Sequence, residues 1–512
     1  MILSVRGPVG LAQGTWAVAG GGTGLGLARP LLPLPAPGRI AWAPVTDDRL
    51  QRLLDAQTAQ EQASHRLPSL AAGLARHGAL AWSGGRGRID GANGPAPDAD
   101  VQYRAGSITK TFVAAEVMRL RDEGKLDLSD PVGQYFDAAD VSRLTIGQLL
   151  SQTSGLRAET SGPWWERTPG SPFESLTQAS LGPDARRLRP GRQFHYSNVG
   201  FALLGHLVST VRKKPWYDVI AEELLAPLGM TRTTTRPQAP HATGFAVHPH
   251  ADLLLPEPEH DAVAMAPAGQ LWTTVADLAR WAGFLAGPGG PGGTDGKAVL
   301  LSAASLAEMR EPTGIDDTAD QPWTQGYGLG LQLWNEGGRR SHGHTGSMPG
   351  FVGILKIDTA SGDAAVALCN STSGFGVSVF ASDLLRILAE NDPQVRPEWT
   401  AASVAGDALE LVGTWYWGPS AFLVSMVGGT DGGELEFRVG RSGERAFRFR
   451  RSGDGQWTGV DGYFAGEPLR PVPGPDGRVV ALDLASHTYT RLPYDEAAPV
   501  PGGVDPGGWR AG

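Results

Sequence analysis

The sequence predicts an α/β domain followed by a smaller all-β domain. Strand-like apolar runs stand near residues 70–82 and again near 353–368, with helical periodicity between them, as in a domain whose sheet joins both ends of its chain. Beyond residue 408, short apolar segments recur about every ten residues between glycines, a spacing typical of a β-sandwich or small barrel. A chain of 512 residues has room for two or three domains.

Each element of the first domain is predicted from its periodicity and its flanking residues. The clearest helix carries an apolar stripe at Val113, Val117 and Leu120. Gly124, directly after it, is a typical C-cap, and the pair at 77–78 suits a tight hairpin. In chain order we expect a helix from Asp47, strands 70–74 and 79–82, helices 109–123, 145–152, 198–211 and 277–285, strands 353–357 and 364–368, and a helix near 377–390.

The chain is expected to have five parts. A Gly/Pro-rich extension, 1–45, precedes the α/β domain, 46–391, and a proline-containing linker, 392–408, follows it. The all-β, barrel-like domain covers 409–498, and 499–512 form a tail. Strands of the second domain are expected at 412–417, 422–427, 435–439, 446–450, 456–460, 479–484 and 488–492.

Composition excludes several classes of protein. With 41% hydrophobic and 19% charged residues, the chain can bury a full core and does not resemble a disordered segment. The net charge is −9 and no basic cluster beyond short Arg pairs is present, so nucleic acid is not an expected partner. Cys369 is the only cysteine, which excludes intrachain disulfides, structural Cys-zinc sites and iron–sulfur clusters.

The N-terminal extension bears on localisation. Residues 7–28 carry no charge and are long enough to span a bilayer, but their many glycines and Gln13 dilute the hydrophobicity. We therefore expect no stable membrane insertion. Residues 17–19 have the small-x-small form of a signal cleavage site, yet the apolar segment before them is poor. The sequence favours a cytoplasmic protein, with export as the alternative.

Ser107 and Lys110 form a Ser-x-x-Lys motif at the start of an expected helix. Residues three apart share a helix face, so the amine can reach the hydroxyl. A neutral lysine could take the hydroxyl proton, and the helix N-terminus favours the developing anion. The alternative is a helix cap followed by a solvated lysine.

Two further motifs offer complementary chemistry. Tyr196-Ser197-Asn198 supplies a phenol that can relay a proton and an amide that can bind a carbonyl; the alternative is a packed tyrosine with an asparagine cap. His344-Thr345-Gly346-Ser347 precedes the last strand pair. A small-residue edge strand can lie along an extended substrate and direct a backbone N–H at an oxyanion; the alternative is a glycine-rich turn.

In this order and at these separations, the three motifs resemble the serine β-lactamase and penicillin-binding-protein superfamily. The class C β-lactamase-like branch, with its DD-carboxypeptidases, D-aminopeptidases and related esterases, is the most similar. The resemblance covers about residues 66–390 and implies a β-lactamase/transpeptidase-like α-β-α sandwich with an antiparallel sheet and a helical subdomain. Other matching phrases are Tyr103-Arg104-Ala105-Gly106, Leu144-Thr145-Ile146, residues 149–156 and 227–230, Pro267-Ala268-Gly269, and residues 277–281.

The resemblance also implies roles for the motif residues. Ser107 would be the acylated nucleophile, and Lys110 and Tyr196 would share the work of the base, with the first proton acceptor left open. The backbone N–H groups of Ser107 and Ser347 would form the oxyanion hole. The implied substrate-binding residues are Asn198, which would orient a substrate amide, and His344, Thr345, Gly346 and Ser347.

His344 stands where the β-lactamases have the lysine of Lys-Thr-Gly. A histidine is mostly neutral at pH 7, so its attraction for a substrate carboxylate should be weaker. The resemblance adds that His-Thr-Gly occurs among the peptidases and esterases of this group, which favours one of these over a dedicated β-lactamase. An imidazole with an ordinary pKa of about 6.5 would become charged as the pH falls from about 7.5 to about 5.5. Carboxylate-bearing substrates are then expected to gain over neutral analogues at low pH.

The sequence gives less support to a metal site than to the serine-hydrolase motifs. His248, His250 and Asp252 fit the His-x-His-x-Asp pattern of metallo-hydrolases, with His260 nearby. The next expected histidine is replaced by Leu253, so we expect no metal. Residues 164–165, a Trp-Trp pair, either pack in the interior or wall the substrate pocket.

The sequence thus predicts a metal-independent serine hydrolase, without a cofactor, that forms an acyl-enzyme with a small-molecule ester, amide or peptide. One alternative is a class C-like β-lactamase. Another, of a different class, is a non-catalytic penicillin-binding-like binding or scaffold protein. The C-terminal domain offers a surface for oligomerisation.

Overall fold

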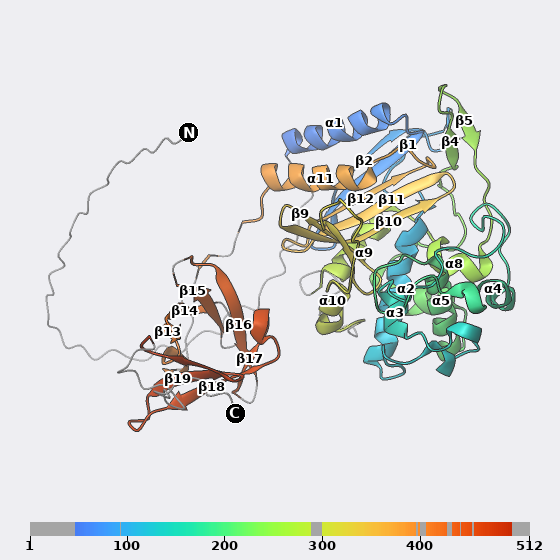
Figure 1. Cartoon of the computed structure of the whole chain (residues 1–512). Helices are drawn as coiled ribbons and strands as arrows, with labels where there is room; N and C mark the ends of the chain where they lie inside the picture. Colours follow the sequence, from blue (N-terminus) through green and yellow to red (C-terminus); the bar gives the residue numbers. More distant parts are fainter. Residues whose placement is uncertain are drawn as a thin grey trace, which may run out of the picture. The chain divides into compact units, whose positions relative to one another are not determined.

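The computed structural model describes residues 47–92, 94–287, 300–395, 398–399, 406–427, 433–440, 442–452 and 455–493. The chain divides into two compact units between Gln394 and Val395 (Figure 1). The expected extension, 1–45, with its candidate cleavage site, and the expected tail, 499–512, lie outside the described residues. Within the described part of the chain, no helix is both long and apolar enough to cross a bilayer.

The first unit is built on one antiparallel sheet of eight strands, in the order β2-β1-β12-β11-β10-β9-β8-β7. Strand β1 (Ser69–Arg76) pairs with β2 (Ala79–Gly87) on one side and with β12 (Ala364–Cys369) on the other, so the sheet joins distant parts of the chain as predicted. The hairpin residues His77 and Gly78 have φ of 51° and 73°, the left-handed geometry of a two-residue hairpin turn. The remaining strands are β11 (Phe351–Asp358), β10 (Arg339–Met348), β9 (Gln332–Glu336), β8 (Gln325–Tyr327) and β7 (Gly314–Ile315).

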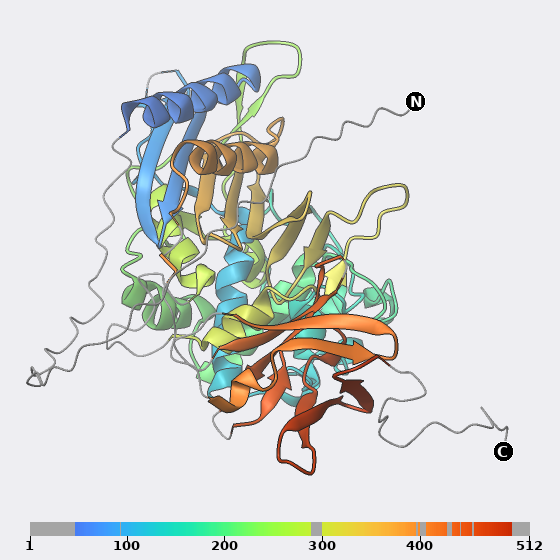
Figure 2. The ribbon, with the colours of Figure 1, turned by 90° about the vertical axis from the view of Figure 1, so that its left-hand side faces the viewer.

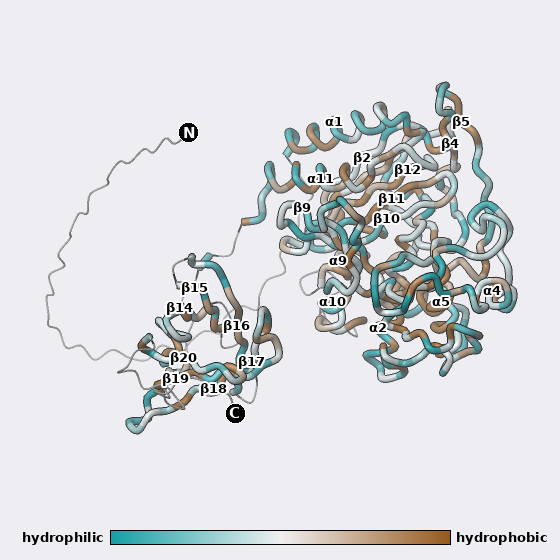
Figure 3. The backbone as a smooth tube through the Cα atoms, in the orientation of Figure 1, coloured by the Kyte–Doolittle hydropathy of each residue, from teal (hydrophilic) through white to brown (hydrophobic). Residues whose placement is uncertain are grey.

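Helices cover both faces of this sheet, which confirms the predicted α-β-α sandwich. Helices α1 (Asp48–Ser64) and α11 (Val377–Asn391) lie side by side on one face (Figure 2). Helix α9 (Val275–Ala286) packs on β1 and β12 from the other face. The mixture of teal and brown along α1 in Figure 3 reflects a helix with one apolar face, whose Leu50 and Leu54 enter the core.

A helical subdomain surrounds helix α2 (Thr109–Asp122), which is buried along most of its length. The ring of Phe112 stacks on that of Trp281 in α9, with centroids 4.0 Å apart, so the start of α2 is held firmly against the core. The other helices here are α3 (Ile146–Leu150), α4 (Phe173–Ser180), α5 (Asn198–Arg212), α6 (Trp216–Ile220), α7 (Ala226–Leu228), α8 (Ala266–Gly269) and α10 (Ala303–Met309); the short strand pairs are β3 (Tyr103–Arg104) with β6 (Trp272–Thr273) and β4 (Phe245–Val247) with β5 (Leu254–Pro256).

The second unit is a closed barrel of eight strands, β13 to β20 in chain order, which confirms the predicted barrel-like domain. Trp415, Phe437 and Phe449 belong to the apolar core of this unit. A short helix, α12 (Gly406–Leu409), precedes the barrel. The strands are β13 (Gly413–Trp417), β14 (Ser420–Val427), β15 (Glu434–Val439), β16 (Arg445–Arg451), β17 (Trp457–Gly459), β18 (Pro468–Pro473), β19 (Val479–Leu484) and β20 (His487–Thr490).

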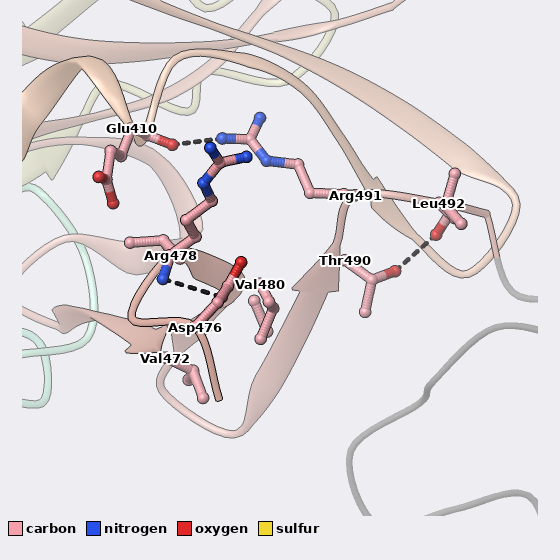
Figure 4. A pocket seen from close by; sticks show the side chains of 10 residues that line it. Glu410, Val472, Asp476, Arg478, Val480, Thr490, Arg491 and Leu492 are labelled. Carbon is pink, nitrogen blue, oxygen red and sulfur yellow. Dashed lines mark hydrogen bonds between the residues drawn. The ribbon is translucent and has the colours of Figure 1, made fainter. Parts of the chain in front are cut away.

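A pocket of 540 Å³ opens on the barrel beside β19 and β20 (Figure 4). Arg491, at its border, donates hydrogen bonds to the backbone carbonyls of Glu410 and Val412, and its guanidinium carbon lies 3.6 Å from the ring centroid of Trp415. The arginine therefore fastens the segment before β13 to the end of β20. The residues that line the pocket include no serine, cysteine or histidine.

Candidate active site

Ser107 lies in a 3₁₀ turn, Gly106–Ile108, that leads directly into α2. Gly106 has φ of +53°, and a Cβ atom at this position would lie 2.4 Å from the backbone nitrogen of Ser347 in β10. Only glycine permits both this backbone geometry and this close approach. The turn thereby leaves Ser107 partly exposed beside β10, at the N-terminal end of a buried helix.

Lys110 is fully buried next to Ser107, so the alternative of a solvated lysine is wrong. Its Nζ atom donates to Ser107 Oγ at 2.9 Å, to Asn198 Oδ1 at 2.7 Å and to the backbone carbonyl of Ala268 at 2.6 Å. Burial lowers the pKa of Lys110 to about 7, against the opposing effect of the carboxylates of Glu159 and Glu166. The amine can therefore be neutral near physiological pH.

The partners of Lys110 determine where its lone pair points once the amine is neutral. An amide oxygen and a backbone carbonyl can only accept hydrogen bonds. The oxygen atoms of Asn198 and Ala268 then take both N–H groups of the neutral amine. The lone pair is left for the hydroxyl of Ser107, the one partner that can donate in return.

Tyr196 and Asn198 are the residues directly before and after the N-cap of α5. Ser197, between them, is the N-cap of α5, because its Oγ accepts the backbone N–H of Gly200 at 3.1 Å. Asn198 is therefore not the cap, contrary to the alternative interpretation, and its side chain contacts Lys110 instead.

Tyr196 lies beside Lys110, as Asn198 does, and also beside Ser107. The side chain of Ser107 opposes the effect of burial on the pKa of the Tyr196 hydroxyl, and the Nζ atom of Lys110 lies 5.0 Å from the centroid of the Tyr196 ring. Burial raises the pKa of the Tyr196 phenol well above its usual range, so the phenol stays protonated near pH 7. The structure thus brings together Ser107, Lys110, Tyr196 and Asn198.

Strand β10 passes beside this cluster, but it is not the edge of the sheet. Residues 339–343 pair with β9, whereas residues 344–348 pair, among the described strands, only with β11. The N–H of Thr345 points to the open side, where it donates to Gln332 Oε1 at 2.8 Å. Since N–H directions alternate along a strand, the N–H of the exposed Ser347 points to that side as well. Gly346, between them, faces β11 opposite Gly353.

His344 is fully buried and has both ring nitrogens occupied. Nδ1 lies 2.6 Å from the carbonyl oxygen of Thr345, and Nε2 lies 3.0 Å from the hydroxyl of Tyr327. The carbonyl requires a donor at Nδ1, and in the neutral ring Nε2 then accepts from the phenol. Burial, together with the nearby charge of Lys110, lowers the pKa of His344 to about 3. The expected charging near pH 6.5 is therefore wrong.

The metal-site alternative receives no support from the geometry. Asp252 forms an ion pair with Arg66 at 2.8 Å, and the Nδ1 atom of His248 accepts the backbone N–H of His250 at 3.2 Å. Within the ranges that the structure describes, no three His, Cys, Asp or Glu residues converge in a way that could hold a metal ion.

Sequence reasoning missed two contributors to the cluster. The carbonyl of Ala268 holds Lys110, and the carboxylate of Glu159 accepts the Nδ2 group of Asn198 at 2.7 Å. The sequence points to Ala268 only because Pro-Ala-Gly is part of the family resemblance. No pattern in the sequence points to Glu159. Of the two tryptophans, Trp165 is buried, whereas Trp164 is 58% exposed.

Comparison with known proteins places this arrangement in a family context. Residues 54–390 match the Beta-lactamase family, and residues 404–491 match a domain of unknown function, DUF7586. Penicillin-binding protein 4 of Amycolatopsis lactamdurans is 31% identical over 346 residues, which cover 63% of this chain and 86% of that protein.

Solved structures show the same fold. The octameric penicillin-binding protein homologue from Pyrococcus abyssi aligns with a TM-score of 0.57 at 18% identity, over 86% of this chain and 99% of that one. The D-amino acid amidase from Ochrobactrum anthropi SV3 complexed with D-phenylalanine aligns with a TM-score of 0.58 at 22% identity, over 67% and 99% of the two chains. With the family match spanning most of the first unit, and the fold and motif geometry in agreement, the chain belongs to the Beta-lactamase family of serine hydrolases.

Proposed function

We propose that the protein is a metal-independent serine hydrolase that acts through an acyl-enzyme on a small-molecule ester, amide or peptide. One observation carries the proposal: a fully buried Lys110, with its pKa lowered to about 7, lies 2.9 Å from the Ser107 hydroxyl. A base with a pKa near the working pH is close to the optimum for general base catalysis.

Acylation follows from the positions of the groups. The Ser107 oxygen attacks the carbonyl carbon of the substrate while its proton passes to the lone pair of Lys110. The N–H groups of Ser107 and Ser347 stabilise the oxyanion of the tetrahedral intermediate. Tyr196, which stays protonated beside Ser107, donates its proton to the leaving group and regains one from Lys110.

Deacylation uses the same groups in reverse order. A water molecule attacks the acyl carbon, and its proton passes to the neutral amine of Lys110, directly or through Tyr196. The Ser107–acyl bond breaks, and the serine oxygen takes up a proton to restore the resting hydroxyl. In acylation Lys110 is the first proton acceptor, because the high pKa of Tyr196 keeps the phenolate scarce.

The neutral His344 favours an esterase or peptidase over a class C-like β-lactamase. It brings no charge to the position where a lysine would attract a substrate carboxylate. The second alternative is a non-catalytic binding protein. Such a protein would not need serine, lysine and tyrosine side chains close together, so their arrangement favours the hydrolase.

A substrate panel tests the proposal. The wild-type protein is incubated with p-nitrophenyl esters, D-amino-acid amides, D-Ala-D-Ala peptides and nitrocefin, and separately with a fluorophosphonate probe and a penicillin. We expect fluorophosphonate labelling and turnover of an ester, amide or peptide. Turnover confined to nitrocefin would support the β-lactamase alternative. Reversible binding without covalent labelling or turnover would support the binding protein.

A further inference from the structure

A cavity of 180 Å³ opens in the first unit beside strands β7, β8 and β9. Part of its wall is apolar, formed by Ile315, Trp323 and Leu333, and part is cationic, formed by Arg310 and Arg340. Among the described residues that line it, none is an aspartate or a glutamate. In a chain with a net charge of −9, this cavity therefore presents a local positive charge.

The cavity lies away from the proposed catalytic cluster, although the same two strands border both. Strand β9 runs from Gln332, whose Oε1 accepts the N–H of Thr345 near the cluster, to Asn335 at the cavity. Strand β10 carries Arg340 at the cavity and Ser347 beside the cluster. The seven steps between these two residues span about 23 Å of extended strand. A ligand in the cavity therefore leaves the catalytic cluster free.

Arg310 brings to the cavity a guanidinium that is fixed in place and partly buried. Its Nε atom donates to the backbone carbonyl of Leu306 at 3.0 Å, and its Nη1 atom donates to that of Ala286 at 3.2 Å. Burial lowers the pKa of Arg310, and no carboxylate opposes this effect. A partly buried charge without a counter-charge is unfavourable, and a bound anion would relieve this.

Arg340 supplies a second guanidinium. The preceding Arg339 forms an ion pair with Asp358 at 2.5 Å, whereas Arg340 is exposed and forms no ion pair within the part of the chain that the structure describes. Arg340 pairs with Asn335 in β9, so both side chains leave the sheet on the same face. Leu333, two residues before Asn335, shares that face and packs against the core cluster to which α10 contributes. Arg310, at the end of α10, thus lies on the same side of the sheet as Arg340.

The apolar part of the wall is unusually exposed. Trp323 is 69% exposed and Ile315 is 41% exposed. The indole Nε1 of Trp323 donates to Asp317 Oδ1 at 2.7 Å, which fixes the orientation of the ring. A cavity of about 150 Å³ holds a benzene molecule, so the 180 Å³ here have room for one aromatic ring.

We propose that this cavity binds a small organic anion whose apolar part is about the size of one aromatic ring, such as an aromatic carboxylate. Its charged group accepts hydrogen bonds from Arg310 and Arg340, and its ring packs against Trp323, Ile315 and Leu333. The site is separate from the hydrolase function proposed above and does not depend on it.

Titration calorimetry of the full chain with benzoate tests the proposal. We expect one benzoate to bind, and the neutral benzamide and the small anion acetate to bind at least about tenfold more weakly. Arg340→Gln removes one cation and Trp323→Ala removes the aromatic wall, and each should weaken benzoate binding by about tenfold. Both residues are exposed, so both variants should keep the fold, which circular dichroism checks.

Arg52→Gln and Trp417→Ala are the matched controls. Arg52 is an exposed arginine of α1, and Trp417 is a 48% exposed tryptophan of β13; both variants should bind benzoate as the wild type does. A wild-type protein that binds no benzoate up to about 10 mM, or whose affinity is unchanged in Arg340→Gln or in Trp323→Ala, would overturn the proposal. Benzoate binding that disappears once Ser107 carries the fluorophosphonate would place the anion in the catalytic cluster and overturn it as well.

Discussion

Burial changes the two nitrogen bases of the site in ways that their sequence motifs do not reveal. Lys110 and His344 are both fully removed from solvent, and in both the neutral form is favoured. For Lys110 this creates a base that can work near pH 7. For His344 it removes the charge that a carboxylate-binding residue would need.

The lowered pKa of Lys110 should set the pH dependence of the proposed hydrolysis. The kcat/KM for a neutral ester should rise with pH through about 7 and then level off, because the neutral amine is the active form and its pKa is about 7. In Lys110→Arg the group stays charged, and kcat/KM should fall by about a hundredfold or more. A wild-type profile that still rises at pH values near 10 would show that Lys110 retains an ordinary pKa.

The second expectation concerns His344. The ratio of kcat/KM for a carboxylate-bearing substrate to that for its neutral ester analogue should stay flat between about pH 7.5 and 5.5, since a pKa of about 3 leaves the ring neutral throughout. Protonation of the base affects both substrates alike and cancels. A ratio that rises about fivefold toward low pH would mean that the ring becomes charged and attracts the carboxylate.

Site residues that belong to a local motif could be predicted from the sequence, whereas those brought in by distant segments could not. The spacing of Ser107 and Lys110 already places both on one side of a helix, and the structure brings them within 2.9 Å. The carbonyl of Ala268 and the carboxylate of Glu159 reach the cluster only through the folding of distant segments. Neither contact leaves a local pattern in the sequence.

Among the elements, the contact between the 3₁₀ turn and β10 matters most for the proposed chemistry. It brings the backbone of Ser347 next to Gly106, and so sets the two N–H groups of the proposed oxyanion hole. A substitution that adds a side chain at residue 106 therefore tests how closely the turn and β10 must approach each other.

Gly106→Ala should abolish fluorophosphonate labelling and destabilise the protein by about 1–3 kcal/mol, because the left-handed backbone and the 2.4 Å contact are both unfavourable. Gly124→Ala is the control: it has φ of +68° as well, but nothing lies within 4 Å of a Cβ there. It should cost about 1–2 kcal/mol in stability and leave labelling intact. Labelling of Gly106→Ala at the wild-type rate would contradict this account of the turn.

The elements differ in how far their sequences predict them. Helices α2 and α11 and strands β1, β11 and β12 were predicted because long apolar runs or stripes define them. Strand β10 reads Arg-Arg-Ser-His-Gly-His-Thr-Gly-Ser-Met, whose polar and glycine residues have low strand propensity, and it is held by pairing with its neighbours. Strand β18 contains three prolines, which normally argue against a strand.

For the whole molecule, buried neutral histidines make stability depend on pH. His342, like His344, is almost fully buried and has its pKa lowered to about 3. A histidine whose pKa is lower in the folded than in the unfolded state contributes stability that is fully present above about pH 6.5 and is lost as the pH falls below it. Below that pH the two histidines bind protons in the unfolded chain but not in the folded chain.

Between pH 7.5 and 5.5 we expect each of these histidines to remove about 1.4 kcal/mol of stability from the first unit. Calorimetry of the full chain measures this change in stability. The unfolding transition of the first unit is the one whose midpoint shifts when Ser107 is acylated. Lys110 and Glu116, with pKa values shifted to about 7 and about 8, titrate in the same range and act in opposite directions, so the comparison with His342→Gln isolates one ring. The stability lost between the two pH values should be smaller in this variant than in the wild type by about 1.4 kcal/mol. An unchanged loss in His342→Gln would show that the ring accepts a proton in the folded state.

Intact-protein mass spectrometry tests whether Ser107 forms the acyl-enzyme. After incubation with the fluorophosphonate probe, the wild-type protein should gain the mass of one covalent adduct, and Ser107→Ala should gain none. The variant should keep its fold, because the Ser107 side chain caps no helix in this structure. A wild-type protein without an adduct, or an adduct of the same mass on Ser107→Ala, would contradict the account.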